Sequence, residues 1–455
     1  MDLYTVILAA GKGTRMRSSI PKVLHPLADL PLLEHVINAA AGLKPKKTIV
    51  VYGHGGDLVK ERLSHIDVSW VEQAEQHGTG HAVNQAMHLI PDNARVLILY
   101  GDVPLTRHQT LLDLLNCDRS HKDSIALLTA TLDDSTGYGR IIRDHAQNVT
   151  HIVEQKDANE AELEVHEVNT GILVASSHCL RHWLDNLSND NAQGEYYLTD
   201  IIAMAVGEGF GVATVSAESE WEILGVNDKS QLASIERHLQ RNIAKDLLTA
   251  GVTLRDPERI DVRGSLEVSN DCEIDVNCVF VGKVILAEGV SIGPNCYLKD
   301  VHVGKGSRIL ANSVLESATL GQFCEIGPFA RIRPDTNLAD KVKIGNFVEV
   351  KKASINENSK VNHLSYVGDA EVGKNVNIGA GTITCNYDGA NKHLTKIGDD
   401  VFIGSDTQLI APVTIGDGAT IGAGSTISKN APTGELTLTR VKQETRQGWK
   451  RPVKK

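Results

Sequence analysis

The sequence of 455 residues predicts two successive folds, an α/β domain with a mostly parallel sheet and a solenoid of six-residue repeats. Apolar runs that end in glycine alternate with amphipathic stretches in the first half. In the second half an aliphatic residue opens almost every block of six. Between the halves, apolar residues three or four positions apart over 228–249, followed by Gly251, predict a connecting helix.

The α/β prediction rests on apolar runs at 4–10, 48–52 and 96–100, which we interpret as strands. Helical patterns at 32–41 and 82–89 lie between them. Near-continuous apolar strands that alternate with helices are typical of a sheet covered on both faces. Ligands of such sheets bind beyond the carboxyl ends of the strands, which is where Gly11 and Asp102 fall.

The solenoid prediction rests on blocks that begin at Ile274 and continue to residue 426. Blocks that begin at Leu298, Leu315, Val350 and Val367 are one residue short, as expected for a coil with a tolerant corner. We predict that the first residue of each block points inward and that the small fifth residue fills a corner. Glycine at the second position is expected to supply turn conformations.

Three cysteines and one interruption stand out within the repeats. Cys278, Cys296 and Cys324 occupy the fifth position, so we interpret them as buried filler rather than as metal or redox groups. A polar segment at 384–396 breaks the repeat. A loop that leaves a rigid solenoid is a natural place for a binding site.

Composition excludes several classes of function. The net charge of −11 argues against a nucleic-acid partner, since phosphate backbones are bound by clustered Lys and Arg. No apolar run approaches ~18 residues, so no membrane span is predicted. No leader peptide is recognised. The seven cysteines are scattered and contain no CxxC pair, which predicts a reducing, cytoplasmic location.

The loop after the first strand, Gly-Lys-Gly-Thr-Arg-Met at 11–16, suits phosphate chemistry. It is neither a dinucleotide fingerprint, because Met16 stands where the third glycine belongs, nor a Walker loop. Backbone N–H groups with Arg15 and Lys22 could still hold a triphosphate. Asp102, after the strand at 96–100, is either a turn-forming residue or a ligand of a hard cation.

These motifs resemble known families. The stretch 8–16 with Pro21-Lys22 resembles the signature of sugar-nucleotide pyrophosphorylases, and the blocks resemble the left-handed β-helix of hexapeptide acyltransferases. The whole chain is similar to the bacterial bifunctional N-acetylglucosamine-1-phosphate uridyltransferases and glucosamine-1-phosphate N-acetyltransferases. The motifs that carry this likeness are YGD at 100–102, GYGR at 137–140, EYYLTD at 195–200, GAGT at 379–382 and Asn386-Tyr387.

The resemblance implies a Rossmann-like α/β nucleotidyltransferase domain at 1–226, a linker helix at 227–250 and a left-handed parallel β-helix with a C-terminal tail at 251–455. It implies acetylation of glucosamine 1-phosphate from acetyl-CoA, then transfer of UMP from UTP to N-acetylglucosamine 1-phosphate with release of pyrophosphate. The product feeds peptidoglycan, lipopolysaccharide and other cell-wall precursors. Mg²⁺ is the implied metal, and a homotrimer with acyl-CoA sites between subunits is the implied assembly.

Site residues are carried over to matching positions. The resemblance implies that Gln73 and the backbone of Gly78 read uracil, and that Asp102 and Asn227 hold Mg²⁺. The full implied site for UTP and UDP-N-acetylglucosamine is Leu8, Ala9, Ala10, Gly11, Arg15, Lys22, Gln73, Gly78, Thr79, Tyr100, Gly101, Asp102, Gly139, Glu154, Asn169 and Asn227.

For acetyl transfer the resemblance implies His363 as general base, a task that suits an imidazole. A lone histidine is more often a surface residue. The block 361–366 around His363 is unusual, however, because it is rich in polar side chains that most other blocks lack. Glucosamine 1-phosphate would be bound by Arg333, Lys351, Tyr366, Asn377, Asn386 and Lys392. Acetyl-CoA would be bound by Ala380, Asn386, Tyr387, Ser405, Ala423 and Arg440.

Alternatives remain at this point. Arg333 and Lys351, one coil apart, either stack on one face or are two solvated charges. The chain could be a single-function sugar-1-phosphate nucleotidyltransferase with a structural or regulatory β-helix, or a scaffold with an inert α/β cap. A solenoid of ~10 coils, the loop at 384–396 and His363 favour two activities, and the loop at 11–16 argues against an inert cap.

Overall fold

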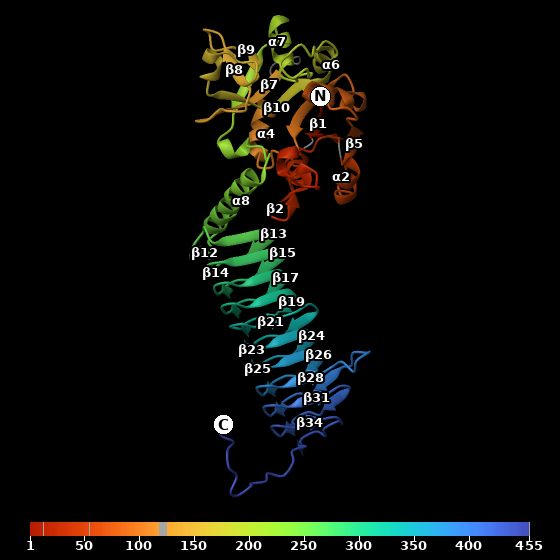
Figure 1. Cartoon of the computed structure of the whole chain (residues 1–455), viewed down its shortest axis with the longest axis vertical. Helices are drawn as coiled ribbons and strands as arrows, with labels where there is room; N and C mark the ends of the chain where they lie inside the picture. Colours follow the sequence, from red (N-terminus) through yellow and green to blue (C-terminus); the bar gives the residue numbers. More distant parts are fainter. Residues whose placement is uncertain (12, 54, 118–124, 455) are drawn as a thin grey trace. The chain divides into compact units, whose positions relative to one another are not determined.

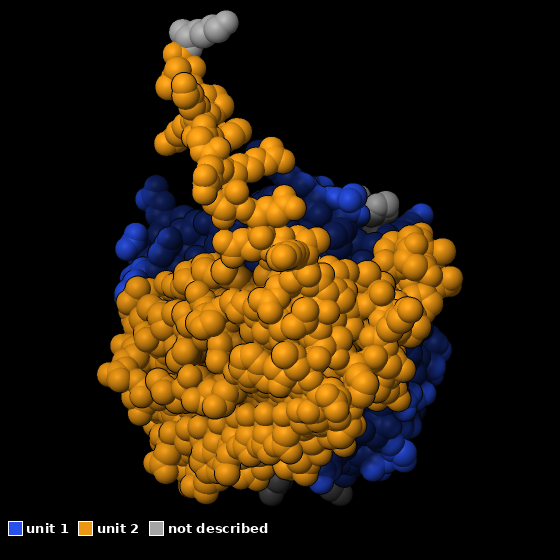
Figure 2. Space-filling view, turned by 90° about the horizontal axis from the view of Figure 1, so that it is seen from below, with its two compact units in different colours: residues 1–239 blue, residues 240–455 orange. Residues whose placement is uncertain are grey.

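A computed structural model describes residues 1–11, 13–53, 55–117 and 125–454. The chain divides into two compact units, residues 1–239 and residues 240–455, which Figure 2 shows in two colours. Each unit has its own buried apolar core. Among the described residues, no helix is both long enough and apolar enough to cross a bilayer.

The first unit is built on one twisted sheet. Along its main path neighbouring strands are parallel, except that β10 (Glu167–Ser176) runs antiparallel to β6 (Ala94–Tyr100) and β7 (Ile125–Thr131), so the sheet is mostly parallel as predicted. A hairpin of β8 (Arg140–Arg143) and β9 (Val149–Val153) adjoins β10. The strand order is β11 (Val212–Ser216), β7 (Ile125–Thr131), β10 (Glu167–Ser176), β6 (Ala94–Tyr100), β1 (Asp2–Ala9), β4 (Lys47–Tyr52) and β5 (Ser69–Glu72).

Both faces of this sheet are covered, as predicted. Successive residues of β1 alternate between two cores, with Val6 and Leu8 in one and Ile7 and Ala9 in the other. The first core is completed by α3 (Thr79–Ala86), α6 (Ser177–Asp185) and α7 (Asp200–Gly207). The second is completed by α1 (Leu32–Ala41), α2 (Gly56–Arg62) and α4 (His108–Asn116).

The direction in which the chain adds strands to the sheet changes at β1. After β1 the chain continues to β4 on one side, whereas after β6 it continues to strands on the other side. In sheets of this kind, ligands bind beyond the carboxyl ends of the strands at such a change. Leu8 is paired with Tyr100, and the N–H of Gly101 donates to the Leu8 carbonyl at 2.9 Å. The loops that follow these two strands therefore begin side by side.

The predicted connecting helix is confirmed as α8 (Lys229–Thr249). Ile235 belongs to a small core of the first unit together with Met16 and Leu27. Ala244 and Leu247 belong to the core of the second unit. The side chain of Gln240 is buried and makes two hydrogen bonds of 2.8 Å to the backbone of Val262.

The second unit is a parallel β-helix, in which strands of successive coils stack in ladders (Figure 1). One ladder consists of β12 (Thr253–Leu254), β14 (Glu273–Ile274), β16 (Ser291–Ile292), β18 (Arg308–Ile309), β20 (Glu325–Ile326), β23 (Lys343–Asn346), β25 (Lys360–His363), β27 (Asn377–Ile378), β30 (Phe402–Ile403), β33 (Thr420–Ile421) and β35 (Leu436–Thr437).

The other strands form the remaining sides of each coil. Long strands turn a corner and take part in two ladders, and the short strands β22 (Thr336–Leu338), β29 (Thr395–Ile397) and β32 (Val413–Ile415) fill the third side. The second ladder runs through β13 (Ile260–Val268), β15 (Cys278–Leu286), β17 (Tyr297–Val303), β19 (Val314–Leu320), β21 (Arg331–Ile332), β24 (Glu349–Ile355), β26 (Tyr366–Val372), β28 (Ile383–Cys385), β31 (Gln408–Ile410) and β34 (Thr426–Ile427).

The predicted inward positions are confirmed. Residues that open blocks, such as Ile292 and Ile344, are buried, and so are the cysteines at the fifth position. The thiol of Cys278 donates to the carbonyl of Gly293 at 3.2 Å, and burial raises the pKa of this thiol to about 12. A buried, protonated thiol packs as a small apolar group, which is the role we predicted.

The explanation for the second-position glycines holds at Gly327, whose φ is 100°, but is wrong for the other glycines at this position, such as Gly379. The left-handed backbone falls at the fourth residue of six-residue blocks, for example Asn295 with φ 59°, and at the third residue of short blocks, for example Asp369 with φ 44°. The second-position glycines instead leave room for the next coil. A Cβ on Gly379 would lie 2.5 Å from the amide nitrogen of Ser405.

The interruption of the repeat is shorter than predicted. Thr384 and Thr395 are buried and pair within β28 and β29, so they continue the ladder. The loop that leaves the coil is therefore 386–394, visible as a projection beside β28 (Figure 1). Asp388 orders it by accepting hydrogen bonds from the N–H groups of Ala390 and Asn391.

Candidate active sites

A cation-binding pair of oxygens lies at the carboxyl end of β6. The ammonium of Lys22, on the turn η2 (Lys22–Leu24), donates to Asp102 Oδ2 and lies 3.2 Å from Asn227 Oδ1. The N–H of Val226 donates to the Asp102 carbonyl at 2.8 Å. The structure thus brings together three predicted residues that come from positions far apart in the sequence, and their two side-chain oxygens already share one cation.

The glycine-rich loop is fixed from both ends. Gly13 has φ 58°, and a Cβ there would lie 2.7 Å from Lys22 Cβ. Met16 ends the turn η1 (Thr14–Met16) and is buried, so the residue that breaks the dinucleotide fingerprint is an apolar anchor. Arg15 is exposed at the surface, where a phosphate could reach it. Lys12 lies outside the described residues.

A cleft of about 950 Å³ adjoins this loop and is lined by Thr14, Gly53, Gln73 and Gln76 among others. Gln73 is buried, and its Nε2 donates to the carbonyl of Gly78 at 3.1 Å. Gln76 was not predicted. No motif marks Gln76 as a site residue, and only its place in the lining of this cleft makes it a candidate.

Gly78 and Thr79 join this cleft to the start of α3. Gly78 has φ 108°, and a Cβ there would lie 2.6 Å from the carbonyl oxygen of Tyr196, so only glycine fits. Thr79 opens α3, and its hydroxyl accepts from the N–H of Leu198 at 3.0 Å.

The remaining predicted residues of the first site cluster around Tyr100. Burial, followed by the nearby charge of Glu154, raises the pKa of the Tyr100 phenol. Burial also raises the pKa of Glu154, whose Oε1 accepts from the hydroxyl of Thr199 at 3.1 Å. The N–H of Asn169 donates to the Gly139 carbonyl at 2.8 Å. Thr199 was not singled out, although it lies within the quoted motif at 195–200.

The second site contains a group of cations. The ammonium of Lys392 lowers the pKa of Lys351, and the charge of Arg333 acts in the same direction. Arg333 also forms an ion pair of 2.7 Å with Glu349. Because two ammonium groups and a guanidinium face one another, the cluster favours an anion such as a phosphate. The proximity of the two charges favours the interpretation in which Arg333 and Lys351 stack on one face of the coil.

Asn386 lies beside this cluster and contacts a residue that sequence reasoning missed. Its Nδ2 donates to Asp369 Oδ2 and lies 3.4 Å from the hydroxyl of Tyr366. Asp369 is buried, and Lys352 lies 3.7 Å from its other oxygen. The short block that begins at Val367 places Asp369 at a corner of the coil. The contact with Asn386 could not be predicted, because it depends on how the next coil stacks on this one.

His363 is exposed at the end of β25, and its ring is oriented by the coil below. The Nδ1 atom lies 3.0 Å from Asn346 Oδ1. When Nδ1 carries the proton that Asn346 accepts, Nε2 is left with a lone pair. The arrangement therefore presents an imidazole nitrogen that can accept a proton.

Three predicted acetyl-CoA residues continue the column that His363 begins. Backbone hydrogen bonds between coils connect the third position of each block with the turn of the next coil, from Gly381 to His363, from Asp406 to Ala380 and from Gly424 to Ser405. The column therefore runs through His363, Ala380, Ser405 and Ala423. Its members above His363 are small, which leaves space along this corner.

Arg440 and Tyr387 are predicted acetyl-CoA residues that lie outside the repeats. Arg440 approaches Gly422 and Gly424, the neighbours of Ala423, with Nη2 3.5 Å from the position of a Cβ on Gly422. Tyr387 is exposed on the projecting loop, and its hydroxyl donates to the Gly389 carbonyl at 2.6 Å.

Asn377 is separated from the other predicted ligands of glucosamine 1-phosphate. It lies on β27 in the first ladder, paired with Lys360, and lines a cleft of about 490 Å³ with Lys341 and Lys343. Tyr366 and Lys351 lie on the second ladder. One chain therefore does not bring Asn377 into the cation cluster.

Comparisons with known proteins agree with this architecture. Residues 5–250 match the family model of the MobA-like NTP transferase domain, and residues 394–429 match the bacterial transferase hexapeptide model. A putative glucose-1-phosphate thymidylyltransferase from Bacillus anthracis overlaps with a TM-score of 0.42, at 17% identity over 51% of this chain and 94% of that chain. The two family models define the class of protein, a nucleotidyltransferase domain joined to a left-handed hexapeptide β-helix.

Relatives that match over the full length define the family. Bifunctional protein GlmU of Aromatoleum aromaticum is 58% identical over 100% of this chain and 99% of that protein. The proteins of the same name from Azoarcus sp. and Methylococcus capsulatus are 58% and 55% identical and covered over 100% and 98% of their lengths. The chain belongs to the GlmU family of bifunctional enzymes.

The chain is accordingly a uridyltransferase and a glucosamine-1-phosphate acetyltransferase of UDP-N-acetylglucosamine synthesis, with UTP and acetyl-CoA as co-substrates. The prediction of two activities is confirmed. The single-function alternative fails because relatives named as bifunctional match 99–100% of this chain, the β-helix included.

Proposed function

We propose that uridyl transfer takes place at the carboxyl ends of β1 and β6, with Asp102 and Asn227 as the ligands of Mg²⁺. The observation that carries this proposal is the position of the Lys22 ammonium between Asp102 Oδ2 and Asn227 Oδ1. A carboxylate and an amide oxygen that share a cation are the hard ligands that Mg²⁺ prefers.

The number of donors also fits this metal. Mg²⁺ commonly takes one or two protein oxygens and completes its shell with water and substrate phosphates. When bound, Mg²⁺ would neutralise negative charge on the phosphates. Lys22 would then be released toward the same phosphates, and Arg15 would reach them from the loop.

The sugar phosphate would attack the α-phosphorus of UTP in line, and pyrophosphate would leave. Little covalent help is needed for such a transfer, so orientation dominates. Gln73 and Gly78 would bind uracil in the cleft beside the loop. Glu154, Asn169 and Gly139 would bind the sugar near Tyr100. Leu8, Ala9, Ala10, Gly11, Thr79 and Gly101 would supply backbone and hydroxyl contacts.

Acetyl transfer would take place at the corner of the β-helix marked by His363. The phosphate of glucosamine 1-phosphate would bind the cluster of Arg333, Lys351 and Lys392. His363 Nε2 would accept a proton from the substrate amine as the amine attacks the thioester carbon, and the thiolate of CoA would leave. Tyr366 and Asn386 would orient the sugar.

Acetyl-CoA would lie along the column of small residues above His363. Ala380, Ser405 and Ala423 are small, and Arg440 lies beside Ala423 at the end of the column. Asn386 and Tyr387 would contact the cofactor from the projecting loop. A ligand that lies along this corner brings its thioester to the level of the imidazole.

The enzyme would act as a homotrimer through its β-helix. The separation of Asn377 from the cation cluster supports shared sites, because a neighbouring subunit could supply the missing amide. Sedimentation at micromolar concentration should give about three times the 49.2 kDa mass of one chain. A fully active monomer in acetyl transfer would contradict this part of the proposal.

The domain limits and the location follow from the same reasoning. The uridyltransferase would occupy 1–226, the linker helix 227–250 and the acetyltransferase 251–455. The location would be the cytoplasm, because the seven cysteines are free thiols, as in proteins of a reducing compartment.

One preparation of the full-length enzyme tests the proposal. Mg²⁺-dependent release of pyrophosphate from UTP and release of CoA thiol from acetyl-CoA should both occur. Each release should require its own sugar phosphate. Loss of pyrophosphate release on chelation, with thiol release intact, would support a metal at the first site alone.

A further inference from the structure

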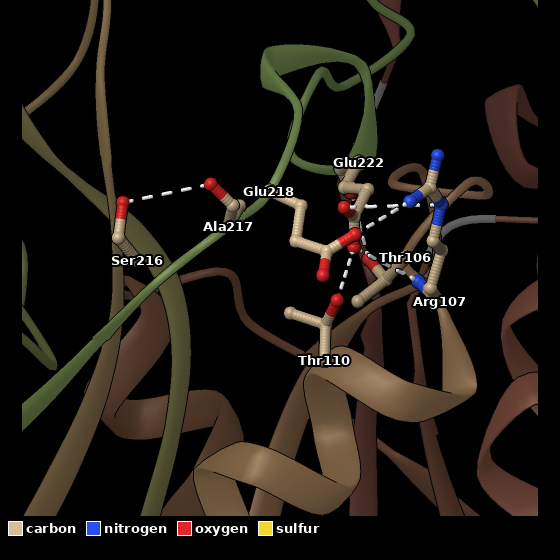
Figure 3. A network of polar contacts seen from close by, with 7 residues as sticks. All are labelled: Thr106, Arg107, Thr110, Ser216, Ala217, Glu218 and Glu222. Atoms are coloured by element: carbon tan, nitrogen blue, oxygen red, sulfur yellow. Dashed lines mark hydrogen bonds and ion pairs between the residues drawn. The ribbon is translucent and has the colours of Figure 1, made fainter.

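A buried carboxylate lies outside both proposed sites. Glu222 ends the turn η4 (Glu220–Glu222) and is 2% exposed. Its Oε2 accepts from the hydroxyl of Thr110 and lies 3.4 Å from the N–H nitrogen of Arg107 (Figure 3). Its carbonyl accepts from the hydroxyl of Thr106 at 2.9 Å. One residue thus binds three neighbours on a segment more than a hundred positions away.

This carboxylate lies at the N-terminus of α4, where it accepts from the N–H of Arg107 just before the helix. The residue that precedes the helix, Arg107, provides no side-chain cap, so N–H groups of the first turn are open to an external acceptor. A negative charge at a helix N-terminus is favourable. Glu222 Oε1 is buried, and among the described atoms it has no hydrogen bond but faces Arg107 Nε at 3.9 Å. Arg107 also pairs with the exposed Glu218 at 3.0 Å.

The contacts connect the two segments that carry the proposed metal ligands. Thr106 lies four residues after Asp102, and Glu222 lies five residues before Asn227. The second connection between these segments is the hydrogen bond from Val226 to the Asp102 carbonyl. Ile223 and Val226, between the two connections, are buried in two different apolar cores. The contacts of Glu222 therefore add a polar anchor at the start of a segment whose middle is held by packing.

We propose that Glu222 is a positioning residue of the uridyl transfer site, which holds the Asn227 amide opposite the Asp102 carboxylate. This inference rests on the proposed function of Asp102 and Asn227. We expect Glu222 to contact neither the metal nor UTP, because its oxygens are directed toward α4 (Figure 3).

The substitution Glu222→Gln tests the role in the full-length enzyme. It keeps the size of the side chain and removes the charge that faces Arg107 and the helix N-terminus. We expect Mn²⁺ binding without UTP, measured by electron paramagnetic resonance, to weaken at least about fivefold. The kcat/KM for UTP should fall roughly 10- to 100-fold, as expected when a positioned group is displaced by about 1 Å. Acetyl transfer should be unchanged.

Glu218→Gln is the matched control. It removes the exposed carboxylate that pairs with the same Arg107, and it should leave Mn²⁺ binding and both activities at wild-type values. If Glu222→Gln folds poorly, Thr110→Val decides the matter, because it removes only the hydroxyl that donates to Glu222. Weaker Mn²⁺ binding by Thr110→Val, by about two- to threefold, would support the proposal.

Two outcomes would overturn it. If Glu222→Gln lowers the melting temperature but leaves Mn²⁺ affinity and the Mg²⁺ dependence of kcat unchanged, Glu222 is a helix cap and nothing more. If Asp102→Asn itself leaves Mn²⁺ affinity unchanged, the proposed metal pair fails and this inference fails with it. Asp102→Asn therefore separates failure of the metal site from failure of the positioning residue.

Discussion

His363 Nδ1 lies 3.0 Å from Asn346 Oδ1, and the two residues occupy the same position in adjacent coils. Their pairing is a consequence of repeat stacking rather than of closeness in sequence. It directs the second ring nitrogen away from the coil below. The proposed general base therefore has an orienting partner, as such bases usually do.

Replacement of His363 by alanine should lower kcat of acetyl transfer by roughly 10²–10⁴-fold, the usual contribution of a positioned base. Binding of glucosamine 1-phosphate should persist, because Arg333, Lys351 and Lys392 remain. Uridyl transfer serves as the internal control. Asn346→Ala should give a smaller loss in kcat with KM unchanged. Near wild-type acetyl transfer by the His363 variant would assign proton acceptance to water or to the substrate phosphate.

Replacement of Asp102 by asparagine should disable uridyl transfer alone. It removes one negative charge from the oxygen pair while it keeps the shape of the side chain. We expect a loss of roughly 10²–10³-fold in kcat, comparable to the loss of one group that stabilises developing charge. The measurement is pyrophosphate release against Mg²⁺ concentration. Equal loss of acetyl transfer would point instead to misfolding.

Replacement of Lys392 by alanine should change the pH dependence of substrate binding. Lys392 holds the pKa of Lys351 below its ordinary value, so Lys351 loses its proton at lower pH than an isolated lysine. Without Lys392 the pKa of Lys351 should rise, and the alkaline loss of phosphate affinity should move to higher pH. Affinity at neutral pH should fall, because one cation is gone. Titration of glucosamine 1-phosphate binding across alkaline pH gives the answer, and an alkaline limb that moves to lower pH would contradict the argument.

Replacement of Ala423 by phenylalanine should obstruct the column of small residues above His363. We expect KM for acetyl-CoA to rise at least about tenfold, with uridyl transfer unchanged. Ala311→Phe is the matched control, since Ala311 occupies the third position of a coil below His363. Sedimentation of both variants shows whether assembly is intact. Equal effects of the two substitutions would argue against a ligand along this corner.

A chain that ends at Leu239 should retain uridyl transfer and lose acetyl transfer. Ile235 and the residues around it complete the core of the first unit, whereas Gln240 makes its hydrogen bonds to Val262 in the second. The measurement is pyrophosphate release by a fragment whose circular dichroism shows a folded domain. A folded fragment without this activity would show that the first site needs residues beyond 239.

Periodicity made much of the fold predictable. The inward positions that open the six-residue blocks could be read from the pattern, because each block meets the same environment, whereas the buried Thr384 and Thr395 were assigned to the interrupting loop. The error over second-position glycines has a physical cause. The sequence shows only that these positions carry no side chain. The structure shows why, since the backbone at Ser405 in the next coil occupies the space where a Cβ of residue 379 would lie.

Site residues were predictable where a motif marks them and hidden where only tertiary contact does. Asp102 follows an apolar strand, so its place at a sheet edge could be inferred. Asp369 and Glu222 have no local signal, since each acts on a partner brought close by the fold. The separation of Asn377 from Lys351 was equally hidden, because it depends on which side of the coil each strand occupies.

Stacked coils also give the second unit a constant spacing along its axis. Neighbouring strands in a sheet are about 4.8 Å apart, so the three coil steps from His363 to Ala423 span about 14 Å. The length of the corner available to an extended ligand therefore comes only in whole steps of one coil. Deleting or adding a coil between these residues would change the reach of the site by a fixed increment, whereas substitutions within a coil would change only its width.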